Sequence, residues 1–327
     1  MTVERLPWVS EDPASLRLFE LAQKVASTAT TLLIVGESGT GKDHLARLVH
    51  EIGPRRDAPF LKIDCASLPP HLVESELFGH ERGSFTGAVE RKLGRLEMGG
   101  AGTIVLDEVA ALSPEAQGKM LRVLQERSFE RLGGTETLHI TARIIALTNV
   151  DLPAAVKNGT FREDLYFRLN VLTLAVPALR ERRADILPLA LHLLNIVRLV
   201  HGRGEAQLSE ASRRMLLAYA WPGNIRELRN ALERAIVFAR GSTMSPEGVS
   251  ATGGENLLEP RDFPENIRAA ASGAANFGAE LLSLEEIERN AIAATLEATR
   301  YQITRSSKIL GISRKTLLEK RKKYGLK

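Results

Sequence analysis

The sequence has few of the features that mark exported or membrane proteins. Its 327 residues include a single cysteine, Cys65, which excludes an internal disulfide framework and is typical of a reducing cytoplasm. No apolar run approaches the ~18 residues that a membrane span needs, and residues 1–7 contain no apolar signal core. With 44% hydrophobic and 26% charged residues, wholesale disorder and low complexity are excluded as well. We therefore expect a soluble, cytoplasmic protein of two or three domains with no membrane partner.

The net charge of the chain is small, but its positive charge is concentrated at the C-terminal end. Residues 300–327 contain ten Lys or Arg and one acidic residue, a net charge of +9, while the whole chain carries only +4 and the remainder therefore −5. A basic tail on a mildly acidic body is typical of a chain that binds a polyanion through its C-terminus. Charge alone fits a solvated helix face equally well, so a motif has to decide between the two.

The first half of the chain alternates short apolar runs with longer amphipathic stretches, such as 42–52 and 115–127. Five runs are candidate strands: Thr31–Val35, Phe60–Asp64, Gly102–Asp107, Ala142–Asn149 and Leu172–Val176. Apolar strands alternating with helices predict an α/β fold with a mostly parallel sheet.

The second half is helical in pattern. Residues 180–240 carry helical spacing, and Asn224–Glu227 predicts a capping box that opens a helix. The segment 244–280 lacks a clear period and is predicted to be a flexible linker. A second capping box, Ser283–Glu286, opens a final helical unit.

A glycine-rich segment follows the first apolar run and precedes a helical pattern. Its residues are Gly36, Glu37, Ser38, Gly39, Thr40, Gly41 and Lys42. The spacing matches the phosphate-binding loop, in which backbone N–H groups converge on phosphate oxygens and the lysine reaches the terminal phosphates. The general motif ends in Ser or Thr, whose hydroxyl binds Mg²⁺, whereas Asp43 stands here. A carboxylate holds a metal directly or through water, so we expect ATP and Mg²⁺ as ligands, with Asp43 among the metal ligands.

The partner motif is the apolar run 103–106, which ends in Asp107 and Glu108. Strands often end in acidic turns, so this run is weak evidence alone. Following a phosphate-binding loop by about 65 residues, it favours hydrolysis over binding alone. We expect Asp107 to hold Mg²⁺ and Glu108 to polarise the attacking water.

Residues 74–88 make the match specific. They resemble the signature of bacterial enhancer-binding proteins, the AAA+ activators of sigma-54 RNA polymerase, whose hallmark is a G-A-F-T-G-A loop. Here that loop consists of Gly83, Ser84, Phe85, Thr86, Gly87 and Ala88. From the residues alone, the loop is either a mobile tip with an exposed Phe or a hairpin turn with a buried one. The resemblance implies a tip that contacts the sigma factor through Phe85 and Thr86, and we expect Ser84 to be tolerated in place of the usual Ala.

The resemblance carries over to other positions one at a time. It implies a first sensor strand ending in Thr148 and Asn149 near the γ-phosphate, and a second sensor at Arg226 in a helical lid. It implies that Arg162 and Arg168 are arginine fingers that reach the ATP of a neighbouring subunit; without the family context they would be ordinary surface ion pairs.

Asp64 stands where many relatives have an Asn that restrains the catalytic glutamate. An ionised Asp cannot donate a hydrogen bond to Glu108 as an Asn can, so the switch differs here.

The basic tail contains a helix-turn-helix pattern. Two helix candidates, Ile303–Leu310 and Arg314–Tyr324, are joined by a turn in which Ser313 is the expected N-cap. Five apolar residues would pack the pair: Ile309, Leu310, Ile312, Leu317 and Leu318. The expected DNA-contacting residues are Ser313, Arg314, Lys315, Thr316, Lys320 and Arg321, the first four near the major groove and the last two near phosphates. The segment resembles the Fis-type DNA-binding domain, which usually pairs; residues 283–299 are the expected dimer helix.

The resemblance implies four segments: an ATPase α/β subdomain over 1–178, a helical lid over 179–243, the linker over 244–280 and the DNA-binding domain over 281–327. It implies a ring, hexameric when active and dimeric at rest, that binds double-stranded enhancer DNA and acts on sigma-54 and its RNA polymerase. No N-terminal receiver or ligand-sensing domain is expected in this sequence; if the protein naturally lacks one, a separate partner or the expression level would set its activity. The alternative is a nucleotide-gated DNA-binding regulator or repressor that does not drive sigma-54; the intact loop and Glu108 favour the activator.

Overall fold

The computed structural model describes residues 8–85, 88–239, 256–271, 284–299 and 301–326. Contacts divide the chain into one unit that ends at Pro264 and a second that begins at Glu265. Each unit is described by itself. Among the described residues, no helix is long and apolar enough to cross a membrane.

A five-stranded parallel sheet forms the centre of the first unit. Its strands are β1 (Leu32–Val35), β2 (Phe60–Asp64), β5 (Thr103–Asp107), β8 (Arg143–Thr148) and β9 (Leu172–Ala175). Their order across the sheet is β2-β5-β8-β1-β9, and every pairing is parallel. Each strand lies within one residue of its expected bounds, and the α/β prediction with a parallel sheet is confirmed. Because β1 lies between β8 and β9, the loop after β1 opens at the point where the strand order reverses, which is where α/β sheets bind ligands.

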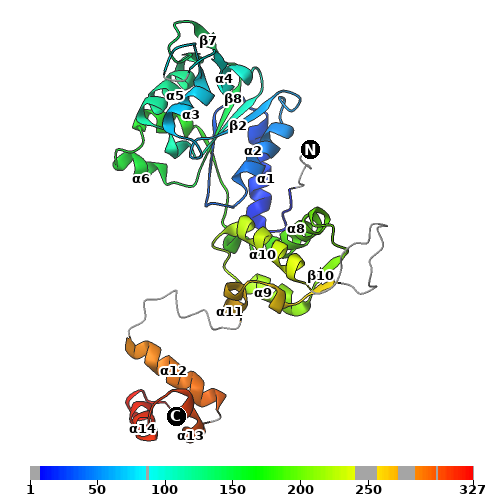
Figure 1. Ribbon diagram of the computed structural model, residues 1–327, viewed down its shortest axis with the longest axis vertical. Helices are drawn as coiled ribbons and strands as arrows, with labels where there is room; N and C mark the ends of the chain where they lie inside the picture. The colour runs from blue at the N-terminus through cyan, green and yellow to red at the C-terminus, as the bar shows by residue number, and fades with distance from the viewer. Residues whose placement is uncertain (1–7, 86–87, 240–255, 272–283, 300, 327) are drawn as a thin grey trace. The chain divides into compact units, whose positions relative to one another are not determined.

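Helices cover both faces of this sheet, as its nearly continuous apolar strands require. They are α1 (Pro13–Ala26), α2 (Lys42–Glu51), α3 (Pro70–Phe78), α4 (Arg95–Met98), α5 (Pro114–Glu126), α6 (Leu152–Lys157) and α7 (Glu163–Leu169). Alternate residues of β1 divide between two cores: Leu32 and Ile34 pack with α1 and α2, while Leu33 packs with α3 and α5. Figure 1 shows these two pairs of helices on opposite sides of the sheet.

Two short hairpins extend from the α3 side of the sheet. They pair β3 (Gly79–His80) with β4 (Lys92–Leu93), and β6 (Ser128–Glu130) with β7 (Thr137–His139). The first hairpin encloses the 83–88 loop in sequence, and the second lies beside it, because His80 bridges to Leu132.

The rest of the first unit is a helical lid. Its elements are α8 (Ile186–Val200), β10 (Ala206–Leu208), α9 (Glu210–Ala218), α10 (Asn224–Phe238) and β11 (Asn256–Leu258). The prediction that 244–280 is a linker without regular structure is wrong for 256–271. There β11 pairs in parallel with β10, and α11 (Glu265–Ala271) follows. The strand partner comes from about 50 residues earlier in the chain, so no local period announces it.

The second unit contains three further helices, α12 (Leu284–Ala298), α13 (Ile303–Ile309) and α14 (Arg314–Lys323). Its core combines the buried Ile292, Leu296 and Leu317, with Leu310 and Ile312 packed against them. Two members of the predicted packing set do not belong to it. Ile309 is 62% exposed and Leu318 is 49% exposed, so neither contributes to this core. The second capping box begins at Ser283, which lies outside the described residues.

Candidate functional site

The glycine-rich loop is a P-loop in shape as well as in sequence. It connects β1 to α2, and Gly39 and Gly41 have φ angles of 77° and 102°, which favour glycine. The Lys42 Nζ donates to the carbonyls of Gly36 and Glu37 at 2.8 and 3.1 Å, so the ammonium curls over its own loop. Burial lowers the pKa of Lys42, while the negative charges of Glu108 and Asp107 oppose that shift. The loop, the lysine and the two carboxylates therefore form one electrostatic site.

The acidic pair stands at the end of β5, as expected. Glu108 has a φ of 50°, a left-handed conformation that a glutamate adopts at some cost and that is common at functional sites. Its Oε2 accepts a hydrogen bond from the backbone N–H of Asn149 at 3.2 Å. Asn149 thus reaches Glu108 through its backbone, at the end of the neighbouring β8. Thr148 is fully buried and its hydroxyl accepts from the Val150 N–H, so it does not share that role.

The two expected metal ligands meet on a lysine that the sequence analysis missed. Lys62 Nζ lies 2.5 Å from Asp43 Oδ1 and 2.7 Å from Asp107 Oδ2. Burial lowers the pKa of Lys62, but the hydrogen bonds with Asp107 and Asp43 outweigh it and the net shift is upward. The sequence feature that could have identified Lys62 is its place in the sheet. It lies on β2, next to β5, two residues before Asp64, which is the register partner of Asp107.

Two carboxylates that share one nitrogen suit a hard divalent cation. Mg²⁺ is usually held by one or two carboxylates together with waters and substrate phosphates, and Asp43 and Asp107 supply that number. No cluster of three or more His, Cys, Asp or Glu that could hold a metal occurs in the part of the chain that the structure describes. The donor set therefore fits a metal that arrives with a nucleotide.

The Asp64 carboxylate caps the turn that follows β2. Its Oδ1 accepts from the N–H groups of Ala66 and Ser67, at 2.9 and 3.1 Å, which fixes the turn after β2. The neighbouring Cys65 is 2% exposed, and burial raises the pKa of its thiol to about 12. Cys65 is therefore an unreactive core residue, and Asp64 stabilises the turn after β2.

The lid contacts the P-loop through four side chains, of which the buried Arg182 donates its Nη2 to the Thr40 carbonyl at 2.6 Å. Arg226 Nη1 donates to the Ser38 hydroxyl at 2.7 Å, which places the expected second sensor at the loop. Arg180, in the turn Leu179–Glu181, donates to both oxygens of Glu37, at 2.8 and 2.5 Å. Asn224 Nδ2 donates to Glu37 Oε2 and to the Ser38 carbonyl, at 3.1 and 3.0 Å.

The predicted capping role of Asn224 is wrong. Gly223 is the N-cap of α10, and the Glu227 carboxylate accepts from its N–H at 2.8 Å. The Asn224 side chain is fully buried, and its oxygen accepts from the Leu179 N–H at 2.7 Å. Contacts with distant residues outweigh the local cap, so neither hydrogen bond of the expected box forms: Glu227 accepts from Gly223 instead, and the Asn224 side chain bridges lid and P-loop.

The two expected arginine fingers lie on the surface. Arg162 Nη2 pairs with Asp164 Oδ2 at 2.8 Å, and Arg168 is exposed on α7. Within the described ranges, no hydrogen bond joins either arginine to residues 36–42. An exposed guanidinium away from its own P-loop is available to a neighbouring chain.

The 83–88 loop is described at residues 83–85 and 88; Thr86 and Gly87 lie outside the described residues. The Phe85 ring packs edge-on against His80, with centroids 5.0 Å apart, and Phe85 is partly buried. Phe85 is therefore neither a fully exposed tip nor a fully buried turn residue, because its ring packs on His80 at the base of the loop. The Ser84 hydroxyl is buried with no hydrogen-bond partner.

Arg131, which the sequence analysis did not single out, anchors the base of this loop. Its side chain is 2% exposed and pairs with Glu81, Glu97 and Glu136 at 2.8–3.0 Å. These hydrogen bonds, led by the one with Glu97, raise its pKa. The arginine therefore fixes the β6–β7 connection to the start of the loop.

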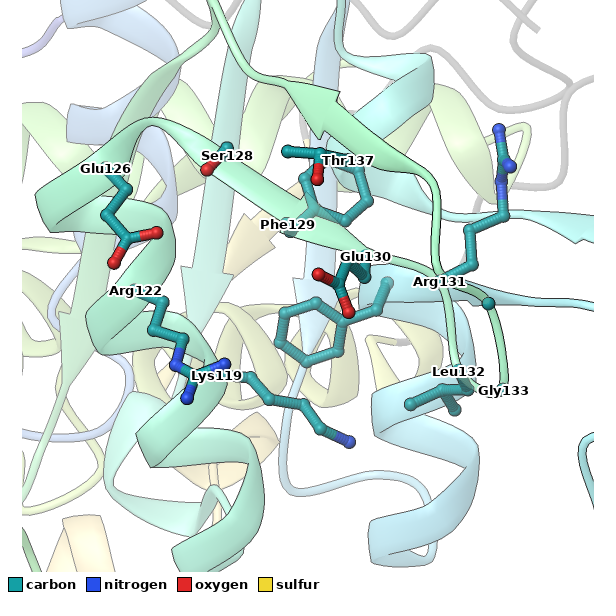
Figure 2. Close-up of a pocket in the computed structure, with 12 residues that line it drawn as sticks. Lys119, Arg122, Glu126, Ser128, Phe129, Glu130, Arg131, Leu132, Gly133 and Thr137 are labelled. Atoms are coloured by element: carbon teal, nitrogen blue, oxygen red, sulfur yellow. The ribbon is translucent and has the colours of Figure 1, made fainter.

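A pocket of about 330 Å³ lies between α5 and the β6–β7 hairpin. Figure 2 shows Lys119 and Arg122 of α5 beside Glu126, with Glu130 on the facing hairpin. Lys119 Nζ is occupied by Glu74 at 2.5 Å. The pocket is lined by both basic and acidic side chains. It contains none of the P-loop residues, so it is separate from the nucleotide site.

The helix-turn-helix forms as expected. Ser313 caps α14 by accepting from the Thr316 N–H at 3.0 Å. Arg314 and Lys315 are exposed at the start of this helix. Lys320 instead pairs with Glu288 of α12 at 2.5 Å, while Arg321 Nε donates to the Leu326 carbonyl at 3.3 Å. The start of α14 is thus more available to a ligand than its end.

The strand order, the P-loop, the acidic strand end and a lid that touches the loop define a P-loop ATPase fold of the AAA+ class. Three family profiles match in succession: "Sigma-54 interaction domain" over residues 8–175, "AAA+ ATPase lid domain" over 180–261 and "Bacterial regulatory protein, Fis family" over 283–324. The chain belongs to the bacterial enhancer-binding proteins, the sigma-54-dependent activator family with a Fis-type helix-turn-helix.

Individual relatives agree with this assignment. The transcriptional regulatory protein FlbD of Caulobacter vibrioides is 40% identical over 99% of this chain and 71% of its own length. The Nif-specific regulatory protein of Azotobacter vinelandii is 42% identical over 93% of this chain and 56% of its own length. The crystal structure of NtrX from Brucella abortus in complex with ADP is similar with a TM-score of 0.71 and 33% identity, covering 98% of this chain and 69% of that one. A second NtrX structure contains ATP.

Proposed function

We propose that this chain hydrolyses ATP in a ring of identical subunits and uses that energy to remodel the closed complex of sigma-54 RNA polymerase with its promoter. The observation that carries the proposal is the convergence of Lys42, Glu108 and Arg226 on one loop at the end of a parallel sheet. A site that only bound nucleotide would not need a strained carboxylate beside its lysine.

The roles follow from the geometry. The P-loop N–H groups and Lys42 would hold the phosphates, and Asp43 and Asp107 would hold Mg²⁺, which neutralises charge that develops on the phosphates. Glu108, oriented by the Asn149 N–H, would accept the proton of the attacking water.

The proposed ring of subunits is based on the two expected arginine fingers. Arg162, the N-cap residue of α7, and Arg168 on α7 are exposed and would complete the site of the next subunit. Head-to-tail contacts of this kind close into rings. We propose a hexamer as the active form and a dimer at rest, with residues 284–298 as the dimer helix.

Each of the two units would carry one output. The loop 83–88 would contact the sigma factor, its base held by Arg131 and its Phe85 released from His80 when it engages. The C-terminal unit would bind double-stranded enhancer DNA through Arg314 and Lys315 at the start of α14.

The deciding experiment measures open-complex formation by purified sigma-54 RNA polymerase on a closed promoter. The protein is added with ATP or with a non-hydrolysable analogue, and the matched controls are Glu108→Gln and Thr86→Ala. We expect opening with ATP alone, no opening with either variant, and wild-type ATP hydrolysis by Thr86→Ala. Hydrolysis by the wild-type protein without opening would overturn the activator and favour the nucleotide-gated DNA-binding regulator. Normal opening by Thr86→Ala would overturn the loop assignment.

A further inference from the structure

A cation built into the chain stands between the two proposed metal ligands. Asp43 lies in the first turn of α2, Asp107 ends β5, and Lys62 comes from β2 at the edge of the sheet. The Lys62 nitrogen is within 2.7 Å of one oxygen from each carboxylate. Three separate elements therefore converge on a single ammonium group.

This position is not shared by the P-loop lysine. Lys42 Nζ donates to the Gly36 and Glu37 carbonyls. Among the described residues, Asp43 and Asp107 each form one ion pair, and Lys62 is the partner in both. The Asp107 side chain is 16% exposed, so an unpaired charge there would be costly. Lys62 supplies its counter-charge when no nucleotide is bound.

Asp43 and Lys62 also form a matched set. The general P-loop motif has a neutral hydroxyl after its lysine, whereas Asp43 adds a negative charge where the phosphates arrive. A lysine that reaches both Asp43 and Asp107 compensates that extra charge.

We infer that Lys62 is a positioning residue that holds Asp43 and Asp107 in the absence of nucleotide and competes with the divalent cation for their oxygens. This inference rests on the proposed function, since it assumes that the site binds a metal–nucleotide complex. An ammonium and a divalent cation cannot both contact the same two oxygens at close range, because like charges repel. Loading the site with metal therefore requires Lys62 to release the carboxylates, and metal-free nucleotide benefits when Lys62 keeps them.

The test compares nucleotide affinity with and without metal. A fluorescent ATP analogue is titrated into the full chain in Mg²⁺ and in EDTA, and the ratio of the two dissociation constants is the readout. We expect Lys62→Met to increase the preference for metal–nucleotide by about three- to tenfold, because metal loses a competitor and metal-free nucleotide meets two uncompensated carboxylates. Lys62→Arg, which can pair with both carboxylates, should restore the wild-type ratio.

The control is Lys92→Met, which removes a lysine paired with Glu76 at 2.6 Å on a hairpin remote in sequence from the P-loop. A purely structural Lys62 would shift both dissociation constants together and leave the ratio unchanged; that result would overturn the inference. Failure of the wild-type protein to bind the analogue in Mg²⁺ would overturn the proposed function itself.

Discussion

Glu37 carries the ionic part of the contact between P-loop and lid, so removing its charge should weaken that contact by a measurable amount. The hydrogen bonds from Arg180 and then Asn224 lower the pKa of Glu37 from 4.5 to about 2. At face value that shift corresponds to about 3 kcal/mol. The side chains of Arg180 and Glu37 are 42% and 45% exposed, and solvent screening reduces such a pair to about 1 kcal/mol. We expect Glu37→Gln to lower the free energy of unfolding at pH 7 by about 1 kcal/mol.

The pH dependence gives this prediction a sign. A carboxyl whose pKa is lower in the folded chain stabilises it above its ordinary pKa, and that stability is lost as pH falls toward the folded value. The difference between wild type and Glu37→Gln should therefore be full at pH 7 and shrink between pH 4.5 and about 2.

The assay is urea unfolding followed by tryptophan fluorescence. Trp221 is fully buried in the lid and Trp8 is the second tryptophan of the chain, so a Trp8→Phe background isolates the lid signal. The control is Asp57→Asn, which removes a pair with Arg56 whose side chains are 90% and 69% exposed and should change little. Equal unfolding of wild type and Glu37→Gln at pH 7, or a difference that stays undiminished as the pH falls from 4.5 to about 2, would refute the reasoning.

Three further predictions concern the catalytic and DNA-binding residues. Glu108→Gln should bind ATP like the wild type but release phosphate at least about 100-fold more slowly; wild-type turnover would remove Glu108 from catalysis. Ser313→Ala should destabilise the C-terminal unit by about 1 kcal/mol, because the α14 cap is lost, and thermal unfolding of residues 265–327 within the full chain would report it. Lys315→Ala should weaken DNA binding and reduce its salt slope by about 1, whereas Lys320→Ala should change the slope less, because Glu288 already holds Lys320; equal slopes would contradict this ranking.

The sheet and the P-loop could be predicted because their signals are local. Apolar runs such as 103–106 specify buried strands by themselves, and the glycine spacing of 36–42 specifies the loop. The Ser313 cap was predictable for the same reason, since a cap involves residues three positions apart.

The missed features all depend on contacts between distant segments. Lys62 became part of the site through the register of β2 against β5, and Asn224 left its cap because Leu179 and Glu37 offered buried partners. The strand at 256–258 forms because β10 supplies an edge. A pattern read along the chain contains none of these partners, so only the folded arrangement assigns them.

Gly39 has a consequence for how this protein tolerates mutation. A Cβ at Gly39 would lie 2.5 Å from the Gly223 carbonyl, and the Ile225 N–H donates to the Gly39 carbonyl at 3.0 Å. The loop and the lid are thus joined by a hydrogen bond between backbone groups, which a change of side chain at Ile225 would leave intact. Any side chain at Gly39 would push the lid outward before it met a phosphate. Because the φ of 77° at Gly39 also favours glycine, substitutions there should distort the phosphate cradle and break its contact with the lid at the same time.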